Sequence, residues 1–333
     1  MLLLTGASGM LGPAILAAFG PGRCLALQHR APTPAPMVAG DITQHRLGLS
    51  RAEYNQLVDR IDGVVHAGAI TSVAWSAEDL ALANVEGTRN IIGLATDAQV
   101  PLHHMSTFYV AGSDGKLSGA PANAYQSTKR EAEYLVAEAG IPTAVYRLPK
   151  LIGDTATGVT STFRTGLYTA VKTIVTGNAH ILPAPKRSWV DFLPRDHVAQ
   201  CLRSAIDAQL TGTFWITAGR SAIPLESFVD ACIDLATTLG RDVVRPRIVD
   251  PEVVERLIMP AFGDLMPAQL MGQMRFGNNL ASGFALEKYL PDSRDDLPDG
   301  VSFPPIPDLL ESLRASLGYW ADNFVLREPV PVT

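Results

Sequence analysis

Residues 1–12 read M-L-L-L-T-G-A-S-G-M-L-G, a short apolar run followed by glycines in the spacing G-x-x-G-x-x-G. The apolar run predicts a first buried β-strand, and residues 11–19 predict a helix. Glycines between a strand and a helix let the backbone approach a pyrophosphate, which the N–H groups and positive dipole end of the helix would bind. We therefore predict a dinucleotide-binding turn; the alternative is a glycine-rich turn without a ligand.

The second predicted strand, residues 23–28, ends at Q-H-R, where a site that prefers NAD usually has an acidic residue for the ribose hydroxyls. Arg30 either pairs with the 2′-phosphate of NADP or is an exposed loop arginine. In G-D-I-T, residues 40–43, Asp41 either accepts a hydrogen bond from the adenine amine or caps a turn or helix. The cofactor contacts expected in this part of the chain are Thr5, Gly6, Ser8, Gly9, Met10, Leu11, Gly12, Arg30, Asp41 and Ile42.

Residues 62–66 predict a buried strand that runs into the small residues Ala67, Gly68 and Ala69. Small residues there permit close approach of the backbone to a cofactor. The next predicted helix contains Asn84, an unusual choice in an apolar-periodic helix. Asn84 either holds a water or a backbone carbonyl in a proton relay, or is a core polar residue satisfied by the backbone.

Hydroxyl side chains follow a strand in P-L-H-H-M-S-T-F-Y-V-A-G, residues 101–112. In an open α/β sheet the carboxyl ends of the strands carry the chemistry, so Ser106 or Thr107 would hydrogen-bond a substrate carbonyl. His103 and His104 precede this edge. We interpret both as structural, since lone histidines without carboxylate or cysteine neighbours are weak indications of a metal site, and we predict no metal.

A tyrosine and a lysine stand four residues apart in N-A-Y-Q-S-T-K-R-E-A-E-Y-L, residues 123–135. The segment predicts a helix, on which Tyr125 and Lys129 share one face. A nearby cation favours the phenolate, so Tyr125 would have a lowered pKa and could exchange a proton near neutral pH. The alternative is an ordinary helix with a surface tyrosine and lysine.

The composition of the 333 residues, 47% hydrophobic and 18% charged, allows a large core. The net charge of −6, with no basic run, argues against a nucleic-acid partner. Three widely spaced cysteines indicate neither a disulfide framework nor a zinc site and fit a reducing cytoplasm. No apolar run approaches the roughly 20 residues that a membrane helix needs, and the opening reads as a strand rather than a signal peptide.

An ordered set of segments resembles the extended short-chain dehydrogenase/reductases: T-G-A-S-G-M-L-G, G-D-I-T, V-V-H-A-G-A, N-V-E-G-T, M-S-T-F-Y-V-A-G and Y-Q-S-T-K. The resemblance implies a Rossmann fold, a nicotinamide cofactor and a catalytic hydroxyl, tyrosine and lysine. By position, Thr107 is the hydroxyl residue and Tyr125 the acid/base. Lys129 is the partner of Tyr125 and a contact of the nicotinamide ribose, and Asn84 falls where the family has a supporting relay.

A narrower resemblance is to the thioester-reductase and fatty-acyl-reductase branch. It is carried by V-A-W-S-A-E-D-L, S-T-F-Y-V-A-G, Y-R-L-P-K-L-I-G-D-T-A-T-G (residues 146–158) and W-V-D-F-L-P-R-D-H-V-A (residues 189–199). The branch implies reduction of acyl thioesters to aldehydes or alcohols with NADPH. Leu148 and Pro149 end an apolar strand and are expected beside the nicotinamide. Lys150 stands where a glycine is common, and the short interval between Thr107 and Tyr125 suggests a trimmed loop over the substrate.

The expected cofactor is NADPH, with NAD(H) as the alternative. Because the chain starts at the first strand, we expect a thioester to arrive on coenzyme A or on a separate carrier protein. The resemblance is also compatible with a homodimer.

Beyond residue 158 the pattern changes, so we predict a Rossmann-like α/β core with a doubly wound parallel sheet over residues 1–158. Residues 159–333 are expected to supply an interleaved sheet extension and a smaller, mostly helical substrate-binding cap. Helices are predicted at residues 160–176, 196–208, 224–239 and 309–324, strands at 189–193 and 212–217, and a surface loop at 291–308. The methionine-rich residues 253–284 are either a lid over an acyl chain or ordinary helix packing.

Two alternatives to thioester reduction stay open. A ketone, secondary alcohol or nucleotide sugar would use the same first half, and Arg245, Arg247 and Arg256 could hold a diphosphate. A non-catalytic NADP-sensing protein would keep the fold, but it would have no need of the acid/base Tyr125.

Overall fold

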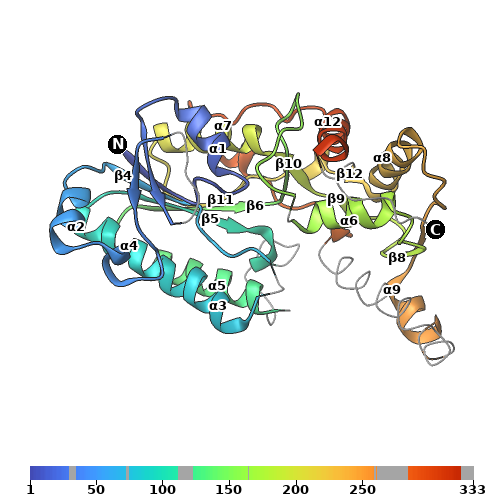
Figure 1. Cartoon of the computed structure of the whole chain (residues 1–333), viewed down its shortest axis with the longest axis horizontal. Helices are drawn as coiled ribbons and strands as arrows, with labels where there is room; N and C mark the ends of the chain where they lie inside the picture. The colour runs from blue at the N-terminus through green and yellow to red at the C-terminus, as the bar shows by residue number, and fades with distance from the viewer. Residues whose placement is uncertain are drawn as a thin grey trace. The chain divides into compact units, whose positions relative to one another are not determined.

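The computed structural model describes residues 1–29, 35–72, 75–111, 123–163, 165–258, 260 and 284–323. The chain divides into two compact units, each built from segments that are separate in sequence (Figure 1). Unit 1 comprises Met1–Leu151, Arg195–Thr217 and Pro291–Pro305, and unit 2 comprises Ile152–Pro194, Ala218–Leu290 and Ile306–Thr333. The boundary expected at residue 158 stays a prediction.

A seven-stranded parallel sheet forms the centre of unit 1 within the described residues, in the order β11-β6-β5-β4-β1-β2-β3. This order confirms the predicted doubly wound Rossmann-like sheet, and β11 confirms the predicted extension by residues 212–217. The order reverses between β1 and β4, and ligands of such sheets bind at the carboxyl ends of the strands beside this point. The strands are β1 (Leu2–Thr5), β2 (Cys24–Gln28), β3 (Met37–Ala39), β4 (Gly63–His66), β5 (Leu102–Thr107), β6 (Thr143–Leu148) and β11 (Gly212–Trp215).

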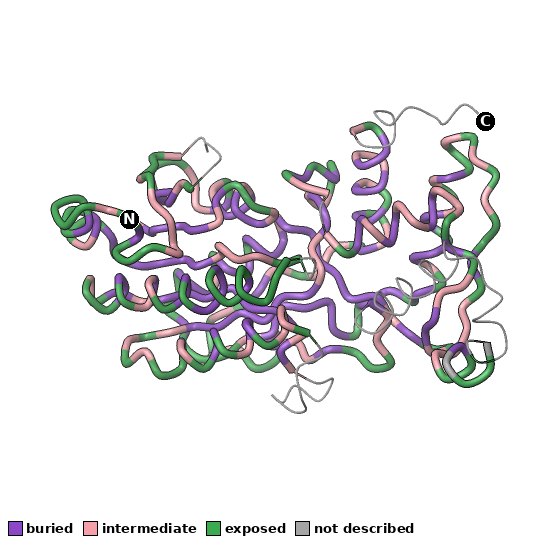
Figure 2. Tube along the Cα trace, turned by 60° about the horizontal axis from the view of Figure 1, so that its bottom comes forward, coloured by how far each residue is buried: buried purple, intermediate pink, exposed green. Residues whose placement is uncertain are grey.

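Helices cover both faces of this sheet (Figure 1). Helices α1 (Gly12–Phe19) and α7 (Arg195–Asp207) lie on one face, where Nη1 of Arg203 donates to the carbonyl oxygen of Ala18 at 2.8 Å. Helices α3 (Ala77–Ala81), α4 (Gly87–Ala98) and α5 (Ala124–Ala137) lie on the other, and α2 (Arg51–Val58) packs against α4. The central strands are therefore buried on both sides (Figure 2). Burial on both faces fits the apolar run of β1, L-L-L-T, whereas β5, L-H-H-M-S-T, also carries buried polar side chains.

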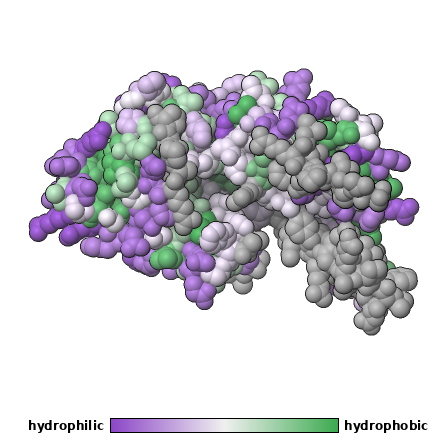
Figure 3. Space-filling view, viewed as in Figure 1, coloured by the Kyte–Doolittle hydropathy of each residue, from purple (hydrophilic) through white to green (hydrophobic). Residues whose placement is uncertain are grey.

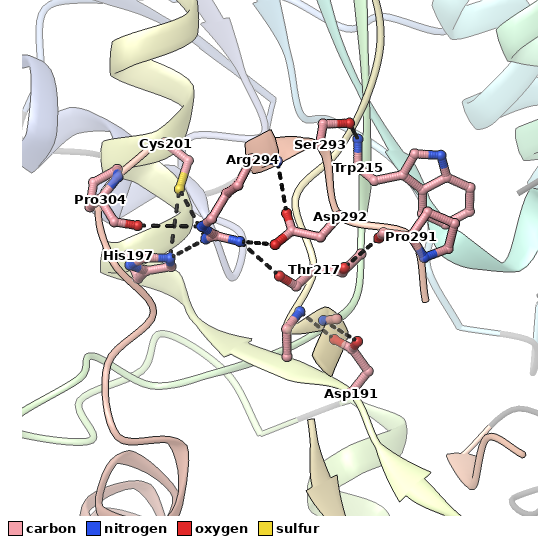
Figure 4. Close-up of polar contacts among 12 residues, drawn as sticks. Asp191, His197, Cys201, Trp215, Thr217, Pro291, Asp292, Ser293, Arg294 and Pro304 are labelled. Carbon is pink, nitrogen blue, oxygen red and sulfur yellow. Dashed lines mark hydrogen bonds and ion pairs between the residues drawn. The ribbon is translucent and has the colours of Figure 1, made fainter. Parts of the chain in front are cut away.

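Unit 2 contains helices α6 (Gly166–Val175), α8 (Leu225–Thr238) and α12 (Leu309–Asn323), with α8 packed against both others. The predicted helix over residues 160–176 begins later, at Gly166, where Thr165 caps it. The single strand predicted over residues 189–193 is two short strands, β9 (Trp189–Val190) and β10 (Phe192–Pro194). Between them the buried carboxylate of Asp191 accepts hydrogen bonds from the backbone N–H groups of Ala218 and Gly219 at 2.9 and 3.1 Å (Figure 4).

Short strand pairs and turns complete unit 2. β9 pairs antiparallel with β12 (Ile223–Pro224), and β8 (Ile181–Pro183) pairs parallel with β13 (Arg247–Val249). The helical turn α9 (Pro251–Val253) follows β13. Residues 259 and 261–283 lie outside the described residues, so the methionine-rich lid stays a prediction.

The segment predicted as a surface loop, residues 291–308, contains only a short 3-10 turn and is mostly exposed or half-buried, and its first residues are anchored in unit 1. Trp215 N donates to Oγ of Ser293 at 2.8 Å, and Oγ1 of Thr217 donates to the carbonyl oxygen of Pro291 at 2.6 Å. Composition suggested an exposed loop because Pro and Asp are typical of turns. The partners that hold this segment are distant in sequence, and no local pattern indicates them.

Arg294 is the centre of this anchor (Figure 4). Its Nη1 donates to Oδ2 of Asp292 at 2.7 Å and to the carbonyl oxygen of Thr217 at 3.2 Å. Its Nη2 donates to Nε2 of His197 at 2.9 Å, and the Sγ of Cys201 lies 3.9 Å from the same nitrogen. Burial and the charge of Arg294 lower the pKa of His197 to about 4, so this ring is neutral and accepts the bond. The cluster is structural, because it ties residues 291–305 to β11 and α7.

On the face drawn in Figure 3, hydrophilic and apolar side chains are interspersed among the coloured residues. Within the part of the chain that the structure describes, no helix has the length and apolar character needed to cross a membrane.

Candidate active site

The glycine-rich turn after β1 packs so closely against neighbouring backbone that side chains would not fit at two of its glycines. Gly6 has a φ of +71°, and a Cβ on it would lie 2.5 Å from the carbonyl oxygen of Ala67. A Cβ on Gly12 would lie 2.3 Å from the carbonyl oxygen of Ala7, and Gly9 is exposed. The turn leads directly into α1, whose N-terminal N–H groups favour an anion. The residues present therefore fit the pyrophosphate of a dinucleotide.

Gly6→Ala is expected to cost more stability than Gly20→Ala and to weaken NADPH binding by about tenfold or more. Both glycines have positive φ, +71° and +79°, but nothing lies within 4 Å of a Cβ on Gly20. Gly20→Ala thus measures the backbone strain alone, about 1–2 kcal/mol, and Gly6→Ala adds a backbone clash. Chemical denaturation and calorimetric titration with NADPH measure the two effects. Equal stability losses with unchanged affinity in both variants would contradict the assignment of this turn.

The A-G-A segment after β4 is tied to the glycine turn by Thr5. The backbone N–H of Gly68 donates to Oγ1 of Thr5 at 2.9 Å, and this hydroxyl donates to Nδ1 of His66 at 2.8 Å. Ala67, Gly68 and Ala69 are partly exposed beside these contacts. Their backbone lies at the carboxyl edge of the sheet, where the cofactor is expected.

Asn84 lies in a π-helical turn, η2 (Leu82–Glu86), between α3 and α4. Its Oδ1 accepts from the N–H of Ile70 at 2.9 Å, and its Nδ2 donates to the carbonyl oxygen of Ile70 at 3.0 Å and to Oγ1 of Thr128 at 3.2 Å. These contacts fit both interpretations, since Asn84 holds a backbone carbonyl and is also satisfied largely by backbone. Single π-helical turns are nevertheless frequent at functional sites, and the relay role stays a prediction.

The structure brings Thr107 and Tyr125 together. Thr107 ends β5, and Tyr125 is in the first turn of α5, which Asn123 caps by accepting from the N–H of Gln126 at 2.9 Å. The side chain of Thr107 is close enough to Tyr125 to lower the pKa of its phenol, and Gln126 Nε2 donates to the carbonyl oxygen of Tyr109 in the turn that follows Thr107. The start of α5 and the end of β5 therefore hold the two hydroxyl groups against each other.

The pKa of Tyr125 is raised to about 12, because burial outweighs the effect of Thr107, which lowers it. The lowered pKa expected from the spacing was wrong in direction. Lys129 is buried, and its Nζ donates to the carbonyl oxygen of Met105 at 2.8 Å and to Nε2 of His104 at 3.1 Å. These hydrogen bonds of the ammonium go to strand β5. Burial lowers the pKa of Lys129 to about 8, opposed by the charge of Glu133.

Ser106 and Thr107 were alternatives for the hydroxyl residue, and their partners distinguish them. Oγ of Ser106 donates to Oε1 of Glu133 at 2.5 Å. Glu133 is in turn paired with Arg147, with 2.7 Å between Oε2 and Nη2, and both side chains are almost completely buried. Ser106 is thus engaged in a buried ion-pair network, whereas Thr107, on the opposite face of the strand, contacts Tyr125.

Asp41 caps a turn in the structure. Its Oδ1 accepts from the N–H and the hydroxyl of Thr43 at 2.9 and 2.8 Å, and Nε2 of His29 lies 3.2 Å from its Oδ2. The carbonyl oxygen of the neighbouring Ile42 accepts from Nδ2 of Asn90 at 2.8 Å. The adenine contact of Asp41 stays a prediction, and Arg30 lies outside the described residues.

The remaining predicted cofactor contacts lie at the same edge of unit 1. Leu148 is the register partner of Thr107, so the end of β6, which Pro149 follows, lies beside the end of β5. Lys150 comes next, and its Nζ is 4.6 Å from the ring centroid of Phe108, in the turn after Thr107. Lys150, which stands where a glycine is common, therefore stabilises the turn at Phe108 by a cation–π contact. Ser8 is exposed, Met10 is partly exposed, and Leu11 is buried at the start of α1.

Two features of the site escaped the sequence interpretation. His104 was assigned a structural role, yet it contacts the amine of Lys129. The sequence analysis did not predict the Glu133–Arg147 pair. Glu133 stands four residues after Lys129 on the same helix face, and this spacing could have indicated a charged neighbour. His103 does have a structural contact, 3.0 Å from its Nδ1 to the hydroxyl of Tyr146. Among the described residues, no group of three His, Cys, Asp or Glu side chains could hold a metal ion.

A family model and a known relative match this chain. The NAD-binding family model described as "Male sterility protein" matches residues 28–202, more than half of the chain. The isonitrile lipopeptide synthase of Streptomyces coeruleorubidus is 30% identical over 243 residues, which cover 60% of this chain and 16% of that protein. The chain thus spans less than a fifth of the length of this relative.

Two solved structures share the fold. The terminal R domain from the myxalamid PKS-NRPS biosynthetic pathway superposes with a TM-score of 0.74 at 21% identity, covering 99% of this chain and 92% of that one. The Bordetella bronchiseptica enzyme WbmH, solved in complex with NAD+, gives a TM-score of 0.66 at 18% identity, with 97% and 98% covered.

Proposed function

Since this chain belongs to the male sterility protein family, a branch of the extended short-chain dehydrogenase/reductases, we propose that it reduces acyl thioesters with NADPH. The observation that carries the proposal is the proximity of Thr107, which ends β5, to Tyr125 in the first turn of α5. In the same sheet, the glycine turn after β1 fits a dinucleotide. The named relatives, a lipopeptide synthase and an R domain of a PKS-NRPS pathway, favour a thioester over other carbonyl compounds.

The residues of unit 1 have separate roles in this chemistry. When bound, the nicotinamide supplies the hydride. Tyr125 donates its phenolic proton to the carbonyl oxygen, and the hydroxyl of Thr107 hydrogen-bonds the same oxygen. Lys129 would bind the ribose of the cofactor through its ammonium. Departure of the thiol from the reduced carbon then leaves an aldehyde, and a second round gives an alcohol.

The raised pKa of Tyr125 bears on its protonation state before hydride transfer. A phenol with a pKa of about 12 carries its proton throughout the neutral range and is ready to act as an acid. Oxidation of an alcohol would instead need the phenolate as a base.

NADPH is proposed over NADH because no acidic residue follows β2 and Arg30 stands nearby in sequence. Arg30→Ala is expected to weaken NADPH binding by about tenfold while leaving NADH binding unchanged, since a charge-assisted bond to phosphate is lost. Calorimetric titration of the wild type and of Arg30→Ala with NADPH and with NADH measures the ratio of the two dissociation constants in each protein. An equal loss for both cofactors, or none, would count against the 2′-phosphate contact.

The direct test is oxidation of NADPH, followed by absorbance, with acyl-CoAs, acyl groups on a phosphopantetheinyl carrier, aldehydes, ketones and nucleotide sugars offered in parallel. Thioester-dependent oxidation is the expected result. Activity with ketones or aldehydes alone would keep Tyr125 as the acid and discard the thioester. Calorimetric binding of a nucleotide sugar would favour that alternative, although Arg245 of the proposed diphosphate cluster is already paired with Asp230 at 2.9 Å.

A further inference from the structure

The amine of Lys129 is held by two acceptors of strand β5. One is the carbonyl oxygen of Met105 at 2.8 Å, and the other is Nε2 of His104 at 3.1 Å. Both Lys129 and His104 are buried, with exposed fractions of 3% and 1%, so water does not compete for these bonds. An ammonium has three N–H donors, and two are used here. Among the described residues the third donor has no acceptor, so it is available to a ligand.

The contact fixes the tautomer of His104. An ammonium can only donate, so Nε2 of His104 must accept, and the ring proton must be on Nδ1. Burial and the charge of Lys129 lower the pKa of His104 well below its usual range, so the ring stays neutral. Its Nδ1 is buried with no hydrogen-bond partner in the described part of the chain. Leaving the buried Nδ1–H without an acceptor costs free energy. The hydrogen bond that His104 does make is the one that its Nε2 accepts from Lys129.

We propose that His104 is a positioning residue for Lys129: its neutral ring accepts a hydrogen bond from Nζ and holds the ammonium on β5 with one donor free for the cofactor. The proposal rests on the proposed function only in assigning Lys129 to the nicotinamide cofactor. His104 does not relay protons, because Nδ1 leads to no further group among the described residues.

The elements packed around Lys129 contribute charged or titratable side chains to its environment. Glu133, one turn along α5, favours the ammonium, and Arg147 on β6 pairs with that carboxylate. His66 on β4 has its ring centroid 5.3 Å from that of His104, and it is neutral because burial and the charge of Lys129 lower its pKa to about 3. Tyr125 stays protonated in the neutral range. Lys129 is therefore the group in this cluster that titrates near pH 8.

This predicts how cofactor affinity depends on pH. If the ammonium binds the cofactor, the Kd for NADPH is constant below the pKa of Lys129, about 8, and rises above it. In His104→Phe a buried ammonium loses an acceptor, its charged form is less favourable, and the rise in Kd begins about one pH unit lower. In His104→Gln the side-chain oxygen can accept the same bond, so the rise begins near its wild-type position.

The experiment is calorimetric titration with NADPH, without substrate, from about pH 6.5 to about pH 9.5. His103→Phe is the matched control, because His103 is the neighbouring residue on the opposite face of β5 and contacts Tyr146 instead. The expected result is a shift in His104→Phe and none in His104→Gln or His103→Phe. His104→Met replaces the phenylalanine variant if that variant does not fold.

Identical pH dependence in wild type and His104→Phe, or equal shifts in all three variants, would overturn the positioning role. Because no substrate is present, the result is independent of thioester reduction. If the protein shows the expected shift but reduces no thioester, the positioning role of His104 stands and only the proposed substrate is wrong.

Discussion

Tyr125→Phe is expected to lower kcat for carbonyl reduction by about 10²–10⁴-fold, the usual contribution of a general acid. The substitution removes only the hydroxyl that lies near Thr107 and leaves the ring in place at the start of α5. NADPH affinity is expected to stay near the wild-type value, because the glycine turn and Lys129 are unchanged. Steady-state kinetics and calorimetric titration measure the two quantities.

Tyr134→Phe is the control for this variant, since Tyr134 is on the same helix and is 52% exposed. Its activity should equal that of the wild type. If Tyr125→Phe kept activity within a few-fold of Tyr134→Phe, Tyr125 would not be the acid. The alternative of a non-catalytic NADP sensor would gain support if no substrate were reduced by any of these proteins while NADPH still bound.

Arg147→Met is expected to lower the free energy of unfolding by about 3–5 kcal/mol, because it leaves a carboxylate buried without its partner. Glu133 accepts from Nε and Nη2 of Arg147 and from Ser106, and the side chains of the pair are 5% and 7% exposed. The guanidinium also lies 5.1 Å from the ring centroid of Trp215 on β11, so the change affects three strands. Urea denaturation followed by circular dichroism measures the loss.

Arg89→Met is the matched comparison, because Arg89 and Glu86 form an exposed ion pair with 3.2 Å between Nε and Oε2. An exposed pair contributes about 0–1 kcal/mol, so this variant should be close to the wild type. The double variant Glu133→Gln with Arg147→Met should recover part of the loss, since no buried charge is left unpaired. Similar losses for Arg147→Met and Arg89→Met would show that the buried pair has no special role.

The features that the sequence predicted well are those that depend on neighbours along the chain. A strand, three spaced glycines and a helix define the dinucleotide turn locally, and the geometry of Gly6 and Gly12 agrees with it. The buried strand β1 was recognisable because it is apolar on both faces. Helices α7, α8 and α12 lie within two residues of their predicted ends, as far as the described residues extend.

The features that the sequence did not predict depend on contacts between distant segments. The i, i+4 spacing puts Tyr125 and Lys129 on one side of α5, but it does not determine which acceptors on β5 the amine meets. Burial, which the spacing does not reveal, then moved the pKa of Tyr125 upward. Arg294 illustrates the same limit, because its partners His197 and Thr217 are more than 70 residues away in sequence.

The decisive measurement is a single-turnover reaction with an acyl thioester and NADPH that carries two deuterium atoms at C4 of the nicotinamide, with the products analysed by mass spectrometry. Direct hydride transfer predicts an aldehyde with one deuterium at its former thioester carbon, together with one equivalent of free thiol. The same reaction with Tyr125→Phe should give little labelled product. Recovery of intact thioester and fully labelled NADPH from the wild type, under conditions in which the cofactor is bound, would contradict thioester reduction.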